Sequence, residues 1–340
     1  MTDAPVPARV RFLICMVLGI AAAHYVHLLA THVAFHRDVA QLWFAAREVL
    51  HGRNPYSAIG PGRTYEWPWP LYYPLPSVLA VIPISWLSEP LAVSVFAAVS
   101  IATFAWALAE HGYPPLLGML SFSLWHAMHL VQWSPLLAAG LVIPWLSALW
   151  IVKPTIGAAL FAARPTRLAL ASGAALAALS FIVQPNWVHE WLAAFHSANV
   201  QAGKHAGFFA IVQLPAGVLV LAALVRWRRP EARLLAVLSC VPQTLLPYES
   251  VLLLLIPRGW LESIAMTVLS FVMYYVAVRG GPEPYAARVL TLGHAVTLTM
   301  YLPATLMVLR RRNEGTVPAW LERRIVHWPA WIAGSPATQR

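Results

Sequence analysis

Charged side chains are scarce in this sequence of 340 residues. Aspartate, glutamate, lysine and arginine make up 11% of the chain, and hydrophobic residues make up 59%. A soluble globular protein has about a quarter of its residues charged, so the composition argues against that class. Repeated apolar runs of about 18 to 25 residues instead indicate helices that cross a membrane.

Acidic residues are scarcer than basic ones, and the formal net charge is +10. The basic residues gather at the ends of apolar segments, as the positive-inside rule describes for cytoplasmic loops. These clusters are Arg9 and Arg11, Arg164 and Arg167, Arg226 to Arg229, and Arg310 to Arg312. No basic stripe interleaves with exposed aromatic residues, so nucleic acid is not expected as a partner.

Cysteine and the common catalytic motifs are also nearly absent. Cys15 and Cys240 both lie in apolar runs, which excludes a disulfide framework. The chain has no Asp-x-Asp, Walker, Gly-x-Ser-x-Gly or His-Glu-x-x-His motif, which argues against nucleotide-sugar transferases that need a metal, ATPases, hydrolases and proteases. The histidines of the first apolar segment, His24, His27, His32 and His36, have no carboxylate or thiolate at ligand spacing, so no metal is expected.

The apolar runs predict an all-α integral membrane protein with one polytopic domain over residues 1–340. We expect a bundle of about nine to eleven transmembrane helices. The expected spans are about 10–33, 71–87, 91–109, 114–131, 168–183, 207–225, 260–278 and 286–309. The proline-rich regions 134–163 and 234–257 leave the number open, because each could cross or re-enter. The first span resembles a signal peptide but is long enough to remain as a helix that starts in the cytoplasm, and the tail 310–340 is expected on the cytoplasmic surface.

Residues 36–76 form the longest polar interruption, and 36–70 is expected to be an outer loop. This loop contains Asp38, the only aspartate after Asp3. A carboxylate against a membrane domain is costly and marks a candidate functional site. A simpler interpretation is that Asp38 caps a helix, with Gln41 at the spacing of a capping box.

A short amphipathic helix is predicted over residues 38–51, followed by the helix-ending residues Gly52, Asn54 and Pro55. Its apolar positions recur every three or four residues: Val39, Leu42, Trp43, Ala46, Val49 and Leu50. Such a helix is expected to lie in the bilayer interface and not to cross it.

Other candidate site residues combine charge or a phenol with an apolar setting. They are Arg37, Arg53, Tyr56, Glu66, Tyr72 and Tyr73 near Asp38, and Gln132, Lys153 and Glu249 further on. Lys153 is one of only two lysines; it suits a phosphate contact, or its charge reaches the bilayer surface along an apolar stem. Glu249 interrupts an apolar run, and the cap of a helical turn explains it almost as well.

Several ordered pieces of the sequence resemble the GT-C class of polytopic glycosyltransferases, and within it glycosyltransferase family 87, also described as domain of unknown function 2029. An aspartate follows the first helix, and residues 50–56 resemble the family's L-x-G-x-x-P-Y. Residues 72–76 resemble its Y-P-P segment, residues 132–137 its G-Q-x-N-x-L segment, and Lys153-Pro154 its later lysine. Val131 stands where the family often has glycine, and residues 241–249 replace a later segment without its histidine.

The resemblance implies an inverting transferase that moves a hexose, typically mannose, from a polyprenyl-phosphate donor to a lipid or glycan acceptor. By resemblance, Asp38 is the general base, and Lys153, Arg37 or Arg53 stabilises the departing phosphate without a metal or other cofactor. Tyr56, Glu66, Tyr72, Tyr73, Gln132 and Glu249 are then expected to contact substrate. The active site is expected on the periplasmic or outer side of a bacterial inner membrane.

Two other classes of function remain open from the sequence. A lipid or small-molecule transporter or flippase also uses broken helices with charges among them. The charges here are concentrated in a loop and are not expected to pair inside the bundle, which favours the transferase. A structural membrane subunit needs no active site at all.

Overall fold

Helices dominate the computed structural model, which describes residues 5–33, 37–201, 209–279, 285–317, 322–324, 327, 329 and 333–335. The predictions for His36 and for about half of the tail 310–340 lie outside these residues. The longer helices are α1 (Ala8–His32), α2 (Asp38–Leu50), α5 (Glu89–Ala109), α9 (Arg167–Val183), α10 (Trp187–Gln201), α11 (Pro230–Cys240), α12 (Trp260–Arg279) and α13 (Tyr285–Val296). The all-α class is therefore confirmed.

Short helical pieces fill most of the remaining described chain. The α-helical pieces are α3 (Pro55–Ala58), α4 (Leu75–Val81), α6 (Phe122–His129), α7 (Ser134–Ala139), α8 (Pro154–Ala163) and α14 (Leu302–Leu309). Segments of 3₁₀-helix cover Ile82–Ile84, Pro114–Leu120, Pro144–Val152, Ile211–Gln213, Gly217–Arg226 and Pro247–Leu255, and a π-turn covers Thr297–Tyr301. Two-residue strands β1 (Ile59–Gly60) and β2 (Tyr65–Glu66) pair in parallel, with Ile59 opposite Tyr65.

Proline explains why several expected spans are interrupted. The expected span 71–87 contains only α4 and Ile82–Ile84, and 114–131 is divided between a 3₁₀ segment and α6. In the described part of 207–225, 3₁₀-helix covers Ile211–Gln213 and then starts again at Gly217. Many of these pieces start with proline in their first turn, where its missing N–H costs nothing, whereas in a helix interior it breaks the hydrogen-bond pattern. These three stretches are therefore not single continuous helices, and their crossing of a membrane stays a prediction.

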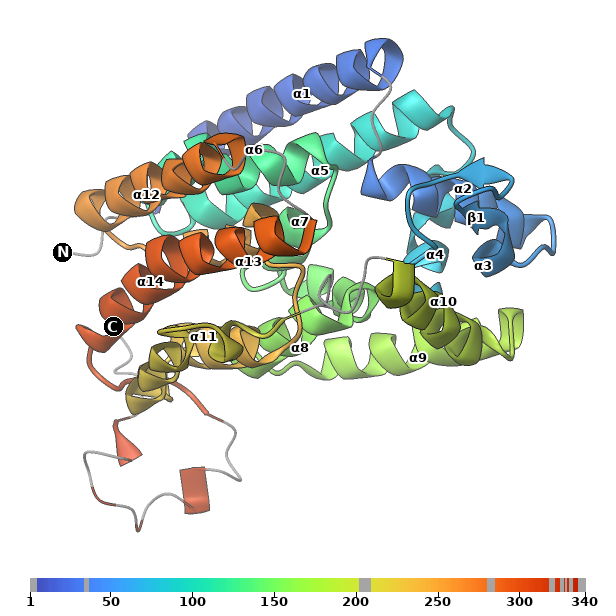
Figure 1. The fold of residues 1–340 in the computed structure, drawn as a ribbon. Coiled ribbons are helices and arrows are strands. Elements are labelled where there is room, and N and C mark those ends of the chain that lie inside the picture. Colours follow the sequence, from blue (N-terminus) through green and yellow to red (C-terminus); the bar gives the residue numbers. More distant parts are fainter. Residues whose placement is uncertain are drawn as a thin grey trace.

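Three helical segments of the described residues are long and apolar enough to cross a membrane. They are α1, α5 and the continuous segment Val289–Leu309, and a fourth results if α9 and Trp187–Ser197, bent by 91°, form one broken span. The α1 helix packs along α5, and an added Cβ at Gly19 would lie 3.1 Å from the Ala98 carbonyl oxygen (Figure 1). The expected total of nine to eleven crossings stays a prediction.

The predicted amphipathic helix is confirmed as α2. Gly52, with φ of 69°, adopts the left-handed conformation that glycine tolerates and ends the helix. Val39, Leu42 and Ala46 are fully buried, because α2 packs against α4, α5 and Ile82–Ile84. Protein thus covers much of the apolar face, while Leu50 stays exposed. The expectation that this helix lies in the bilayer interface stays a prediction.

Polar and basic features lie at opposite ends of the molecule. In Figure 1, α2, α3 and β1 lie toward the right-hand end, and the C-terminal end of α14 lies toward the left-hand end. At that second end, Arg226 donates to the Leu309 carbonyl over 3.2 Å, and Arg311 contacts Glu262 at 2.7 Å. The fold therefore separates the loop that contains Asp38 from the arginine clusters.

Candidate functional site

The carboxylate of Asp38 is the centre of the candidate site. Its Oδ2 accepts hydrogen bonds from Tyr73 Oη at 3.0 Å and from Gln132 Nε2 at 2.5 Å. Asp38 is the first residue of α2, and its backbone N–H donates to the Leu130 carbonyl. Its side chain makes no capping bond to this helix, because neutral donors from elsewhere in the fold hold it. The capping-box interpretation of Asp38 and Gln41 was wrong.

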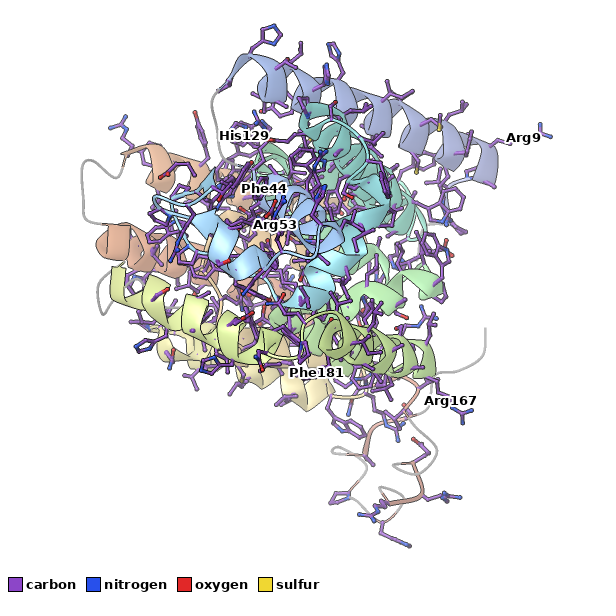
Figure 2. All side chains as sticks on the ribbon, turned by 90° about the vertical axis from the view of Figure 1, so that its right-hand side faces the viewer. Arg9, Phe44, Arg53, His129, Arg167 and Phe181 are labelled. Atoms are coloured by element: carbon purple, nitrogen blue, oxygen red, sulfur yellow. The ribbon has the colours of Figure 1, made fainter. Side chains whose placement is uncertain are left out.

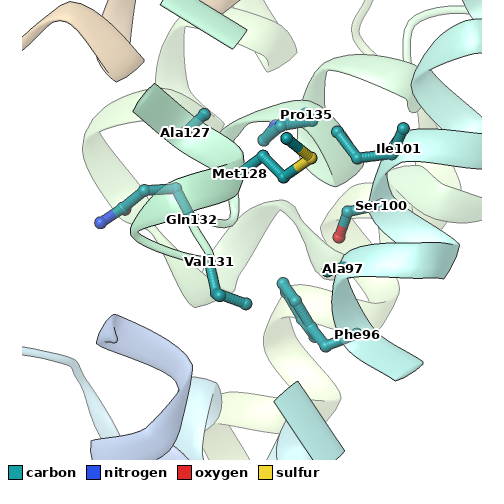
Figure 3. A pocket seen from close by; sticks show the side chains of 9 residues that line it. All are labelled: Phe96, Ala97, Ser100, Ile101, Ala127, Met128, Val131, Gln132 and Pro135. Carbon is teal, nitrogen blue, oxygen red and sulfur yellow. The ribbon is translucent and has the colours of Figure 1, made fainter. Parts of the chain in front are cut away.

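A tight turn between α6 and α7 presents Gln132 to Asp38. The Gln132 N–H donates to the Ala127 carbonyl over 2.8 Å, and Val131 has φ of 53°. A β-branched residue is strained in this left-handed region by about 1 to 2 kcal/mol, a strain that glycine avoids because it has no Cβ. Gln132 also borders a cavity of only about 10 Å³ among apolar side chains, and its amide extends away from them (Figure 3).

A buried ion pair lies next to this aspartate. Lys153 Nζ is 3.1 Å from Glu249 Oε1 and 3.5 Å from Gln132 Oε1, and it lies 4.7 Å from the centre of the Tyr248 ring. The Lys153 side chain is 14% exposed and that of Glu249 3%. The Lys153 ammonium therefore pairs with Glu249 in the protein interior, and Glu249 is not a helix cap.

The electrostatics of this cluster leave one excess negative charge, because two carboxylates share one ammonium. Loss of hydration raises the pKa of the partly buried Asp38, although the Gln132 hydrogen bond and the Lys153 charge oppose this shift. The negative charge of Glu249 raises the pKa of Asp38 further. Asp38 is thus a carboxylate with increased basicity, which suits proton abstraction.

Three tyrosines lie at or next to this cluster and make different contacts. Tyr73 donates directly to Asp38. Tyr56 donates to the Tyr73 carbonyl over 3.1 Å, so Tyr56 helps to hold Tyr73 in position without contacting Asp38. Tyr248 was not predicted as a site residue, although its ring lies beside Lys153 and its hydroxyl is 2.9 Å from Thr244 Oγ1. Its position directly before the predicted site residue Glu249 is the sequence feature that could have indicated it.

Other predicted residues point elsewhere. Arg53 binds Glu48 through two hydrogen bonds of 2.6 and 2.5 Å, and it lies at the end of the molecule that faces the viewer in Figure 2. Arg37 Nη2 donates to the Val33 carbonyl, and burial lowers the pKa of this guanidinium. Glu66 is exposed and accepts from the Gly62 N–H, and the Tyr72 ring packs edge-on against Phe195. Lys153 is therefore the cation that we assign to the Asp38 cluster.

Histidine contacts in the described part of the chain are structural. His129 Nδ1 is 3.0 Å from Tyr25 Oη, and His126 stacks on Tyr248 with ring centres 5.6 Å apart. No group of three or more histidine, cysteine, aspartate or glutamate residues that could hold a metal is found among the described residues. The expectation that no metal or other cofactor is needed stays a prediction.

The chain matches no protein-family model, no curated protein and no solved structure. The resemblance to glycosyltransferase family 87 therefore rests on the sequence segments quoted above. Five of the residues proposed on sequence grounds meet in space: Asp38, Tyr73, Gln132, Lys153 and Glu249.

Proposed function

We propose that this chain is an integral membrane glycosyltransferase of the GT-C kind. It moves a hexose, mannose or a similar sugar, from a polyprenyl-phosphate donor to a lipid or glycan acceptor at the outer face of a bacterial inner membrane. The observation that carries the proposal is the Asp38 carboxylate, held by Tyr73 and Gln132 beside the buried Lys153–Glu249 pair.

In the proposed reaction, Asp38 is the general base. Both of its hydrogen bonds go to Oδ2, so Oδ1 is available to accept the proton of the acceptor hydroxyl. As that proton moves to Asp38, the acceptor oxygen forms a bond to the anomeric carbon from the side opposite the phosphate. The bond between this carbon and the phosphate oxygen breaks, its electron pair leaves with the polyprenyl phosphate, and the configuration inverts.

Lys153 stabilises the negative charge that develops on the departing phosphate. Its ammonium is bound to Glu249 in the structure, and it lies between Glu249 and the amide that holds Asp38. A phosphate oxygen replaces Glu249 as its partner when the donor binds. Thr244 Oγ1, 3.4 Å from Glu249 Oε1, then remains as a donor to the released carboxylate.

The proposed orientation predicts which positions a membrane-impermeant thiol reagent reaches. On a Cys15→Ala, Cys240→Ser background, Ser57→Cys should react in intact spheroplasts, because this exposed residue lies in the proposed outer loop. Arg167→Cys, also exposed, should react only after permeabilisation, because it lies in a basic cluster. Arg228 is unsuitable because it is 2% exposed and pairs with Glu322. The reverse labelling pattern contradicts the orientation.

The raised pKa of Asp38 predicts how the rate of transfer depends on pH under acidic conditions. A base works only when unprotonated, so transfer should fall as the pH falls through an apparent pKa above the ordinary aspartate value of about 3.9. Glu249→Gln removes a negative charge that raises the pKa of Asp38, so it should move this limb to lower pH. Initial rates of transfer across a pH series measure the shift. Glu66→Gln, on an exposed turn, is the matched control, and an equal shift in that variant contradicts the assignment.

One observation favours transport as a second candidate function. The sequence predicted charges confined to a loop, whereas Lys153 and Glu249 pair in the protein interior between proline-interrupted helices. Such an arrangement also suits a transporter or flippase. Reconstituted vesicles separate the two, because a flippase moves labelled polyprenyl phosphate between leaflets without forming a new glycosidic bond.

A further inference from the structure

A second cavity lies away from the Asp38 cluster, between the end of α2 and the bend that joins α9 to α10. It has a volume of about 260 Å³, and its polar lining comes from Arg53, Asn54, Gln184, Asn186 and Glu190. Pockets for drug-sized ligands occupy about 300 to 1,000 Å³, so this cavity suits a smaller ligand of about one sugar unit. The proposed chemistry at Asp38 uses none of these five side chains.

Three of the lining side chains hold one another in place. Asn54 Nδ2 donates to Glu190 Oε1 over 2.8 Å, and Gln184 Nε2 donates to Asn54 Oδ1 over 2.9 Å and to Glu190 Oε2. Asn54 also caps α3 by accepting from the Tyr56 N–H. This network fixes a carboxylate and two amides before any ligand arrives, and such groups donate to and accept from hydroxyls.

The charge of the cavity disfavours anions as ligands. Both oxygens of Glu48 bind Arg53, which offsets its positive charge. Glu190 forms no ion pair with a cation in the described part of the chain. The lining residues Arg53 and Glu190, counted together with Glu48 behind Arg53, therefore carry one excess negative charge. A phosphate or sulfate group would be repelled. Carboxylates and amides together with one guanidinium instead match a neutral, hydroxyl-rich molecule.

We propose that this cavity binds a neutral saccharide unit. That this unit belongs to the acceptor of the transfer reaction rests on the proposed function. Asp38 is the first residue of α2 and the cavity lies at the other end of this helix, about 20 Å away at 1.5 Å per residue. An acceptor of several sugar units would therefore reach from the cavity to Asp38. Asn54 accepts from the Tyr56 N–H, Tyr56 donates to the Tyr73 carbonyl, and Tyr73 donates to Asp38, so hydrogen bonds fix the residues between the two places.

Saturation-transfer NMR on the full chain in detergent tests the binding, with methyl α-mannoside and a mannobiose as probes. Both should bind the unmodified protein, and inorganic phosphate should not displace them. Glu190→Gln should weaken binding about ten-fold or more, because a charged acceptor for sugar hydroxyls is lost. Asn186→Trp, at an exposed lining position, should abolish binding by filling the cavity. The control is His189→Gln, an exposed neighbour on α10 outside the lining, which should bind normally.

The outcomes separate this proposal from the proposed function. If the unmodified protein binds saccharide in a way that depends on Glu190 but shows no transfer activity, the saccharide site is supported and the proposed transferase function is contradicted. If the unmodified protein shows no detectable saccharide binding and transfer activity is unchanged in Glu190→Gln and Asn186→Trp, the cavity is not a saccharide site. That result does not affect the proposed transferase function. Displacement of the sugars by phosphate also contradicts the proposal.

Discussion

Asp38→Asn should lower hexose transfer by at least about 100-fold, because general-base catalysis contributes roughly 10²- to 10⁴-fold. Asparagine has nearly the same shape, and its side-chain oxygen still accepts from Tyr73 and Gln132, which both donate to Oδ2 of Asp38. Its amide cannot take up the proton of the acceptor hydroxyl. The measurement is the initial rate of transfer from polyprenyl-phosphate-linked hexose.

Two controls accompany this variant. The thermal unfolding midpoint should stay close to that of the unmodified protein, because the substitution removes no buried volume and Asp38 caps no helix. Glu66→Gln, a carboxylate change in the same outer loop, should keep its transfer rate, because Glu66 is exposed and bonds to the Gly62 N–H. A folded Asp38→Asn protein with more than about a tenth of the normal rate contradicts the assignment of the base.

Lys153→Met should be the most destabilising of the substitutions considered, and it should also abolish transfer. It leaves Glu249, with a 3% exposed side chain, without its cation. Breaking a buried ion pair from one side costs about 3 to 5 kcal/mol of unfolding free energy. The double variant Lys153→Met, Glu249→Gln should recover most of that loss, because both charges are gone and two neutral side chains of similar volume remain.

The activity of the double variant separates the two roles of Lys153. If its ammonium contacts the donor phosphate, transfer stays lost in the double variant although stability returns. If the lysine only neutralises Glu249, stability and transfer return together, and the phosphate contact is wrong. Donor binding measured with the single and double variants at equal folded fraction provides the comparison.

The local parts of the structure were predictable from the sequence. The helix over residues 38–51 is observed as Asp38–Leu50, because the apolar period and the stop at Gly52 are both encoded within a few residues. Asp38, Lys153 and Glu249 were found because ionisable groups are rare in apolar surroundings and costly there. Gln132 and Tyr73 followed from the resemblance and the aromatic loop.

The long-range parts were not predictable. Hydropathy alone did not show that prolines divide residues 71–87 and 114–131 into short helical pieces. The capping interpretation failed because the donors to Asp38 come from residues 35 and 94 positions away in the chain. Arg53 was one of three candidates for the phosphate contact, whereas Glu48, five positions earlier in the chain, binds it. Pairing at that spacing was visible in the sequence and was overlooked.

The most direct test is transfer by the purified full chain in proteoliposomes that contain radiolabelled polyprenyl-phosphate-mannose and a mannoside acceptor. We expect labelled product with the anomeric configuration inverted, formed by the unmodified protein and lost in Asp38→Asn. Movement of the labelled lipid between leaflets without any new glycosidic bond, equal in both proteins, would contradict the account and identify a transporter.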